Sequence, residues 1–157
     1  KINLNKVLGK NNKDIFSSKK DLLKNINAYF DYLLKKNTNN MEPSSPKDML
    51  FEVMMAKFDV LNLYRKSVKN LLKYIRKNPQ EFITSAPLLI ESMILISTLA
   101  GINVNGVKGL AKVKVILVTY VILISTWSND ETEGLESTMN TLDKYLNQID
   151  KFAKYIR

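Results

Sequence analysis

The run Val115-Ile-Leu-Val-Thr-Tyr-Val-Ile-Leu-Ile124 decides the fold of this chain. Its β-branched residues favour a strand when the run is taken alone. No second run in the sequence carries the turn signals of a hairpin partner, and a lone strand would leave its backbone groups unpaired. The run is too short to span a bilayer, and Lys112 and Lys114 precede it. We therefore predict a buried helix over residues 107–128 and no transmembrane segment.

The sequence on both sides of this run carries helix signals. Ser18 and Asp21 form a capping box before a stripe of apolar residues at three- and four-residue spacing. Ser45 as N-cap and Pro46 at the first helical position begin the next helix. Further helices are expected over residues 65–77, 80–100 and, after a second capping box at 128–131, 132–156. The predicted fold class is all-α, with seven to nine helices.

The closing helix has the most regular apolar pattern in the chain. Its apolar residues follow a strict 4-3 spacing: Leu135, Met139, Leu142, Leu146, Ile149, Ala153 and Ile156. Such a heptad pattern is typical of a seam between helices, although a helix that covers its own core produces the same pattern. Two neighbouring helices would need burial in one small domain. We therefore expect a homodimer whose interface includes Leu135, Met139, Leu142, Leu146 and Ile149.

Composition argues against most classes of enzyme. The 157 residues include no cysteine and no histidine, which removes thiolate nucleophiles and the commonest general base and metal ligand. The carboxylates are scattered without the spacing of an acid–base pair. The net charge of +9 comes mostly from lysine, which codon bias in an AT-rich genome also produces, so it is weak support for a nucleic-acid partner. We expect a cytoplasmic binding protein that is not an enzyme and needs no cofactor.

Methionine and aromatic residues suggest where an apolar ligand would bind. Methionine suits a pocket that must repack, although apolar residues at helical spacing are more often ordinary core. The predicted ligand-binding residues are Met54, Phe58, Met93, Ile96 and Tyr120. Tyr120, with Thr119, Ser92 and Ser97, would supply the few polar contacts that a pocket uses.

The N-terminal stretch Phe16-Ser-Ser-Lys19-Lys-Asp-Leu22-Leu23 resembles the end of the TetR-type helix-turn-helix, where it leads into the connecting helix. The resemblance implies that residues 1–20 are the remnant of a DNA-binding unit and residues 21–157 a ligand-binding and dimerisation domain. The implied DNA contacts are Lys10, Asn11, Asn12, Lys13 and Lys19. A further helix before Lys1 would be needed to complete that unit, and the segment Gly9–Phe16 is about one turn shorter than the family's.

The stretch from Ala86 to Asp143 resembles the C-terminal domain of alphaproteobacterial TetR-family regulators through an ordered series of weak motifs. The series includes Ala86-Pro87, Ala100-Gly101-Ile102, Gly109, Tyr120, Trp127, Thr138-Met139 and Leu142-Asp143. Those regulators are similar to the TetR-fold lipid-binding accessory protein of ubiquinone biosynthesis. That second family carries a Trp-Tyr signature that residues 102–112 of this chain lack. The resemblance implies a TetR-like helical bundle, a homodimer through the last two helices and a cavity for an apolar or lipid-like molecule.

Three hypotheses follow from these observations. The first is a TetR-like transcriptional regulator, a DNA-binding homodimer that senses an apolar small molecule. The second is a lipid-binding accessory protein of ubiquinone biosynthesis that does not bind DNA. The third is a helical dimer without a ligand.

Overall fold

The structure is a computed structural model that describes residues 18–155, with the side chains of residues 18–151. This part of the chain contains six α-helices and no strand, which confirms the predicted all-α class. The helices are α2 (Lys19–Thr38), α3 (Pro46–Leu63), α4 (Arg65–Lys77), α5 (Pro79–Leu99), α6 (Gly106–Asn129) and α7 (Glu136–Tyr155).

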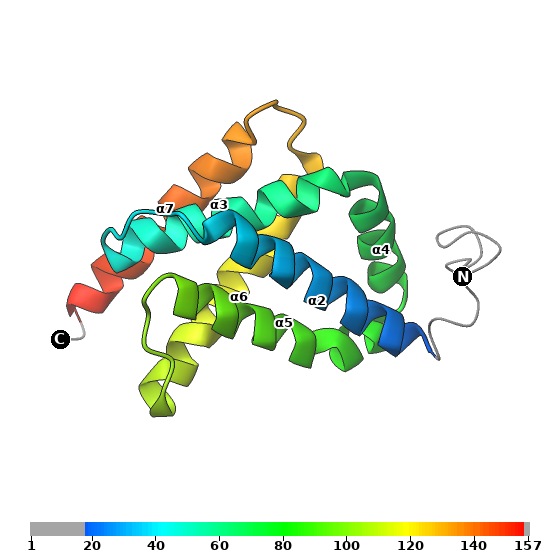
Figure 1. The fold of residues 1–157 in the computed structure, drawn as a ribbon, viewed down its shortest axis with the longest axis horizontal. Coiled ribbons are helices and arrows are strands. Elements are labelled where there is room, and N and C mark those ends of the chain that lie inside the picture. The colour runs from blue at the N-terminus through cyan, green and yellow to red at the C-terminus, as the bar shows by residue number, and fades with distance from the viewer. Residues whose placement is uncertain (1–17, 156–157) are drawn as a thin grey trace.

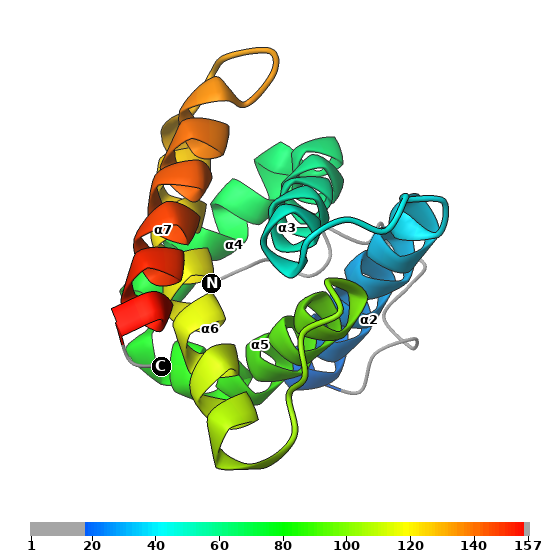
Figure 2. The same cartoon turned by 90° about the vertical axis from the view of Figure 1, so that its left-hand side faces the viewer.

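The helices pack as a layered bundle (Figure 1). Helix α2 packs against α3 and α5, α6 packs against α5 and α7, and α7 also contacts α3. Figure 2 shows α6 and α7 together on one side of the molecule and α2 on the opposite side, with α3 and α5 between them. Helix α4 contacts α3 and α5 at one end of the bundle. The short connections therefore leave a space bordered by α2, α4, α5 and α6.

The predicted helix starts are confirmed at α2 and α3. The Ser18 hydroxyl accepts a hydrogen bond from the Asp21 amide at 3.1 Å, and the Ser45 hydroxyl accepts one from the Asp48 amide at 3.2 Å. Each bond satisfies an amide that the first turn of a helix leaves free. Helix α4 spans the predicted residues 65–77, since α3 and α4 meet at Tyr64.

Helix α6 contains the strand-like run, as predicted, but it is buried on one side only. Ile116, Tyr120 and Leu123 face the core, whereas Val118 is 59% exposed. The prediction of a buried helix is therefore wrong for its outer face. The run is apolar on all sides, so the pattern alone did not distinguish the inner face from the outer one.

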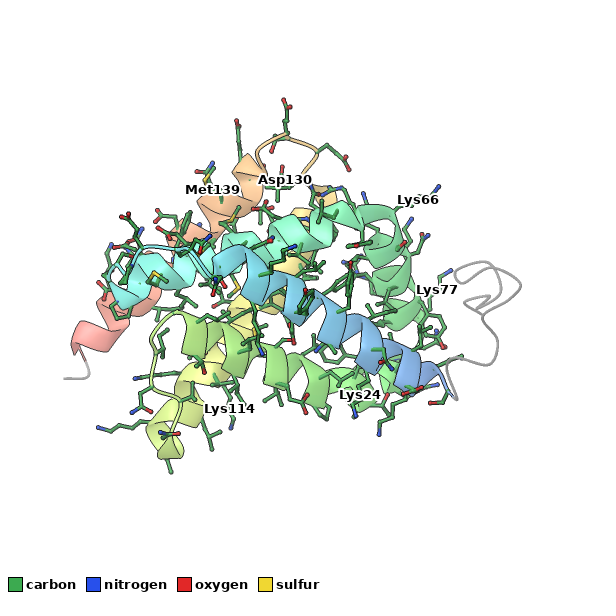
Figure 3. The ribbon with its side chains drawn as sticks, viewed as in Figure 1. Lys24, Lys66, Lys77, Lys114, Asp130 and Met139 are labelled. Carbon is green, nitrogen blue, oxygen red and sulfur yellow. The ribbon has the colours of Figure 1, made fainter. Side chains whose placement is uncertain are left out.

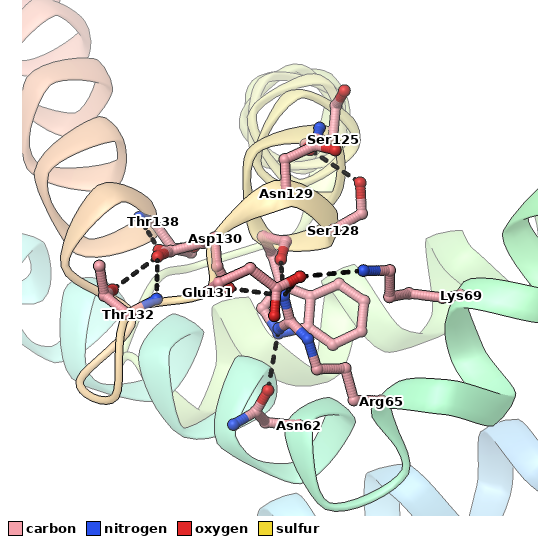
Figure 4. A network of polar contacts seen from close by, with 11 residues as sticks. Asn62, Arg65, Lys69, Ser125, Ser128, Asn129, Asp130, Glu131, Thr132 and Thr138 are labelled. Carbon is pink, nitrogen blue, oxygen red and sulfur yellow. Dashed lines mark hydrogen bonds and ion pairs between the residues drawn. The ribbon is translucent and has the colours of Figure 1, made fainter.

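The predicted start of the last helix is wrong by four residues, because α7 begins at Glu136 rather than at residue 132. Asp130 holds the intervening loop (Figure 4). Its Oδ1 accepts bonds from the Thr132 amide and hydroxyl, and its Oδ2 accepts bonds from the Thr138 amide and hydroxyl at 2.7 and 2.8 Å. One carboxylate thus caps α7 from eight residues away and replaces the predicted capping box at 128–131.

Arg65 ties the same junction to the start of α4. Its guanidinium donates to the backbone oxygens of Trp127 and Asp130, at 3.0 and 2.5 Å, and lies 4.9 Å from the centre of the Trp127 ring. Glu131 accepts from Lys69 at 3.2 Å beside it (Figure 4). Cations at the end of α6 satisfy carbonyls that the last helical turn leaves free. Polar contacts from α4 therefore hold the α6–α7 connection in place.

By length and composition, α5 is the one described helix that could cross a membrane, with a mean hydropathy of 1.7 over its most apolar window. It contains Pro87 and contacts α2, α3, α4 and α6 in the bundle. The core helix of a bundle passes the same test of length and composition. The absence of a transmembrane segment therefore stays a prediction.

Candidate functional site

An apolar cavity of about 170 Å³ lies between α2, α4, α5 and α6. Its side chains come mainly from the inner stripes of these four helices: Leu23, Ile26, Asn27, Phe30, Leu61, Val68, Leu71, Leu72, Ile75, Phe82, Ser85, Leu88, Leu89, Tyr120, Val121 and Ile124. None of these described residues is charged, and three of them are polar. An engineered apolar cavity of about 150 Å³ stays dry and binds benzene, so this volume is sufficient for a small ring or a short chain.

The amphipathic helix α4 supplies the wall that sequence reasoning missed. Leu71, Leu72 and Ile75 recur at helical spacing on its inner side, and all three line the cavity. Its basic residues face away, and Figure 3 shows Lys66 and Lys77 extending from α4 to the outside of the molecule. The sequence already showed the apolar and basic residues of α4 on opposite sides of a helix. The gap that α4 leaves against α2 and α5 is a property of packing, which periodicity does not reveal.

A buried polar cluster borders one side of this cavity. The Lys57 ammonium on α3 donates to Asp31 Oδ1 on α2 at 2.6 Å, with the two side chains 3% and 16% exposed. The Asn27 amide donates to Asp31 Oδ2 at 3.1 Å, and the Ser92 hydroxyl lies 2.9 and 2.8 Å from the two carboxylate oxygens. The cluster joins α2, α3 and α5. Both oxygens of Asp31 are therefore engaged by neighbouring side chains.

Burial and pairing act on Lys57 in opposite directions. Burial lowers the pKa of Lys57, and the charge and hydrogen bond of Asp31 oppose that effect. Opposite charges in direct contact cancel much of the field that either would produce alone. The wall of the cavity near Asn27 is therefore polar, and it carries no net charge from this pair.

Tyr120 connects the cavity to the core. Its ring stacks on Phe58, with the ring centres 5.6 Å apart, and only 5% of the residue is exposed. Burial raises the pKa of Tyr120, and the nearby charge of Asp31 raises it further. The hydroxyl therefore keeps its proton at every physiological pH. No hydrogen bond joins this hydroxyl to another residue within the described range 18–151.

The structure places the five predicted ligand-binding residues in two groups. Tyr120 lines the cavity. Four others, namely Met54, Phe58, Met93 and Ile96, are completely buried in the core beside it and do not line it. The stripe rule identified the inner faces of α3 and α5 correctly. The residues that this rule selected lie on the sides of α3 and α5 that pack tightly in the core, and not on the sides that border the cavity.

The residues of the predicted dimer seam lie mainly inside this chain. Leu135, Leu142 and Leu146 are at most 3% exposed and belong to the core. Met139 is 37% exposed (Figure 3), and Ile149 lines a groove between α6 and α7 together with Val115 and Val118. A second groove, between α5 and α6, is lined by Val118, Val121 and Phe82. The outward apolar surface therefore centres on α6.

Four of the five predicted DNA contacts, Lys10, Asn11, Asn12 and Lys13, lie outside the described residues. Lys19 is the first residue of α2, and its ammonium donates to the Tyr74 hydroxyl at 3.0 Å. Tyr74 donates in turn to Glu81 at 3.0 Å. The start of α2 is therefore tied to α4 and α5.

Comparison of the chain with protein-family models, with curated proteins and with solved structures finds no match.

Proposed function

We propose that this chain binds an uncharged, largely apolar small molecule in the cavity between α2, α4, α5 and α6, as the sensor of a TetR-like transcriptional regulator. The observation that carries the proposal is the cavity itself. It is lined by apolar side chains of four helices, with a few polar groups at one side, which is the composition typical of small-molecule sites. The proposed regulator is a cytoplasmic homodimer without catalytic activity.

The geometry also offers a route from ligand to DNA contact. Helix α2 lines the cavity through Leu23, Ile26 and Phe30, and its first residue is the proposed DNA contact Lys19. A ligand that fits the cavity in only one position of α2 would shift the population of that position. The proposed DNA-contacting residues 10–13 lie five residues before the start of α2 in the sequence. The sensor and the DNA-binding unit would thus share one helix.

Filling the cavity tests the binding part of this proposal. Leu72→Trp replaces a lining residue by a larger one, and the matched control Leu63→Trp makes the same change at a residue that is 72% exposed on α3. Native mass spectrometry of gently purified protein should show a small-molecule adduct in the parent chain and in Leu63→Trp, and none in Leu72→Trp. Octane should bind to the emptied parent chain. Failure of octane to bind, together with no adduct, would contradict the proposal.

Selection from a random duplex library tests the DNA-binding part. The full-length protein should enrich one sequence, with an affinity that falls steeply as salt rises, because lysine–phosphate contacts release counterions. Lys10→Ala with Lys13→Ala should weaken that binding, whereas Lys47→Ala, at the start of α3, should not. Equal enrichment of all sequences would contradict the proposed regulator and would leave only the proposal of a ligand-binding protein.

A second candidate function is favoured by the turn between α5 and α6. Val107 is 85% and Leu110 55% exposed, and Lys108, Lys112 and Lys114 lie beside them without an acidic residue between Glu91 and Asp130. Figure 3 places Lys114 at this end of the molecule. Apolar and basic side chains together favour an anionic membrane surface. Such a surface suits the lipid-binding accessory protein that does not bind DNA.

Flotation with vesicles distinguishes the two candidates. An accessory protein should float with vesicles that contain phosphatidylglycerol, and Val107→Ser with Leu110→Ser should abolish flotation. The regulator should remain in the soluble fraction and should select DNA in the library experiment.

A further inference from the structure

We propose that the occupant of the cavity is an uncharged molecule with a hydrogen-bond acceptor, such as a ketone or an ester, and that Tyr120 donates to that acceptor. This inference rests on the proposed function and names the class of ligand. It is carried by the distribution of charge and of unused hydrogen bonds around the cavity.

The lining of the cavity disfavours a charged ligand. No described residue that lines it is charged, and the nearest ion pair, Asp31 with Lys57, is already internally neutralised at 2.6 Å. A carboxylate or an ammonium placed there would lose its hydration without gaining a partner of opposite charge, which is the most costly form of burial. The lining of the cavity therefore favours an uncharged ligand.

The polar groups of the lining differ in what they can still offer. Asn27 has no spare amide bond, because its nitrogen donates to Asp31 Oδ2 and to the Leu88 carbonyl, at 3.1 and 3.4 Å, and its oxygen lies 3.1 Å from the Ser92 hydroxyl. Asp31 cannot accept the Tyr120 proton readily, because Lys57, Asn27 and Ser92 already surround its two oxygens. The polar groups of this cluster therefore form hydrogen bonds with one another, and none of them bonds to the Tyr120 hydroxyl.

Two lining hydroxyls, those of Ser85 and Tyr120, make no hydrogen bond to another described side chain, and Tyr120 is the more deeply buried of the two. Its hydroxyl stays protonated and has no hydrogen-bond partner among the described residues, while its ring is fixed against Phe58. Hydroxyls inside a protein normally find a partner, so an unpaired one that lines a cavity can donate to an acceptor on a bound molecule. A carbonyl oxygen accepts such a bond without bringing a charge. The fixed ring makes the donor rigid, so the bond costs little side-chain entropy.

Three probes of similar length test the inference: 2-octanone, octane and octanoate. Calorimetry gives the dissociation constants of the ketone and the carboxylate, and headspace partition gives that of the alkane. The parent chain should bind 2-octanone about fivefold more tightly than Tyr120→Phe does, which corresponds to one ordinary hydrogen bond. Octane should bind equally to both proteins, and octanoate should bind more weakly than the ketone. Tyr145→Phe, which makes the same change in the outer groove of α6 and α7, should change none of these values.

A spectroscopic measurement separates a hydrogen bond from a packing effect. The infrared stretch of 2-octanone labelled with ¹³C at its carbonyl should move to lower frequency in the parent chain and in Tyr145→Phe. In Tyr120→Phe it should stay near its value in alkane. Equal binding of ketone and alkane with no shift would overturn the inference and leave the proposed apolar site intact. Tighter binding of octanoate than of the ketone would overturn both the inference and the uncharged ligand of the proposed function. Failure of all three probes to bind would instead contradict the proposed function.

Discussion

At the scale of the residue, the most consequential side chains of this protein are a few polar groups in an apolar interior. Lys57 lies within the apolar stripe of α3 and is 2% exposed, so its charge has no solvent to stabilise it. Asp31 supplies that stabilisation from α2 at 2.6 Å. A buried charge without a partner is strongly destabilising. The pair therefore fixes how α2 and α3 meet, and through Ser92 how α5 meets them.

Lys57→Met should destabilise the protein by about 3 kcal/mol, because it leaves the Asp31 carboxylate buried without its cation. Asp31→Leu combined with Lys57→Met should cost less than Lys57→Met alone, since both charges are then gone. Urea unfolding at neutral pH measures the free energies, and Lys66→Met on the outer side of α4 serves as control. A double variant less stable than Lys57→Met would contradict this account.

The polar cluster also shows what the sequence can and cannot reveal at this scale. Ser18 and Ser45 were predicted as caps because a cap needs only its own next three residues. Asp31, Lys57 and Ser92 were not grouped, because they belong to three helices and contact one another only after packing. Lysine within an apolar stripe is a signal of a buried charge that the sequence analysis did not use, and it would not have identified the partner.

At the scale of the element, the α6–α7 joint depends on Asp130. Burial alone would raise its pKa, but hydrogen bonds from Thr132 and Thr138 outweigh burial and lower the pKa to about 2. A carboxyl whose pKa is lower in the folded than in the unfolded state stabilises the fold above the unfolded pKa. That contribution is lost as pH falls through the folded value. For Asp130 the loss falls between about pH 4 and pH 2.

Asp130→Ala should therefore lower the free energy of unfolding by about 2 kcal/mol at pH 7. The difference from the parent chain should shrink as pH falls from about 4 to 2, where the parent carboxylate becomes protonated. Thermal unfolding across this pH range measures the difference. Glu133→Gln removes an exposed carboxylate from the same loop and should leave the profile unchanged. A difference that is constant with pH would exclude the charged form of Asp130 as the stabilising group.

Gly109 sets the close approach between α6 and the turn that precedes it. A Cβ atom at this position would lie 2.0 Å from the carbonyl carbon of Val104, a backbone atom that cannot move aside cheaply. Gly109→Ala should destabilise the protein by about 2 kcal/mol through this overlap. That loss exceeds the gain of about 1 kcal/mol that alanine brings to a helix. Gly134→Ala, where no atom lies within 4 Å, should be nearly neutral in the same chemical denaturation experiment.

The helices themselves were largely predictable, whereas their far-reaching contacts were not. The bounds of α4 and the helical state of residues 115–124 followed from periodicity, from Asn78-Pro79 and from the lack of a strand partner. The start of α7 did not, because Asp130 caps it through Thr138, eight positions further along the chain. An apolar cavity was predicted, but its position beside α2 and α4 was not, for a similar reason. Periodicity marked the inner faces of α3 and α5, but only the placement of α4 decides which face borders empty space.

At the scale of the whole molecule, an apolar surface on α6 has no cover among the described residues 18–155. Val115, Val118 and Val121 on α6 are 42%, 59% and 41% exposed, and grooves lie on both sides of them. The seam residues Leu142 and Leu146 are used inside the chain, so charges introduced there would unfold it rather than only separate two copies. We therefore expect the proposed homodimer to use the exposed apolar residues of α6, while α5 carries a second exposed set in Ile83, Ile90 and Ile94.

Val118→Asp should consequently separate the proposed homodimer while leaving each chain folded. Two-fold symmetry brings the same residue of both copies near one axis, so the substitution would bury two like charges in one interface. Sedimentation velocity at micromolar concentration should give a dimer for the parent chain and a monomer for Val118→Asp, with the same helical circular dichroism. Leu63→Asp makes a similar change at a residue that is 72% exposed on α3, and it should remain dimeric. A parent chain that sediments as a monomer would contradict the homodimer, because the apolar face of α6 would then be exposed to solvent without a second copy to cover it.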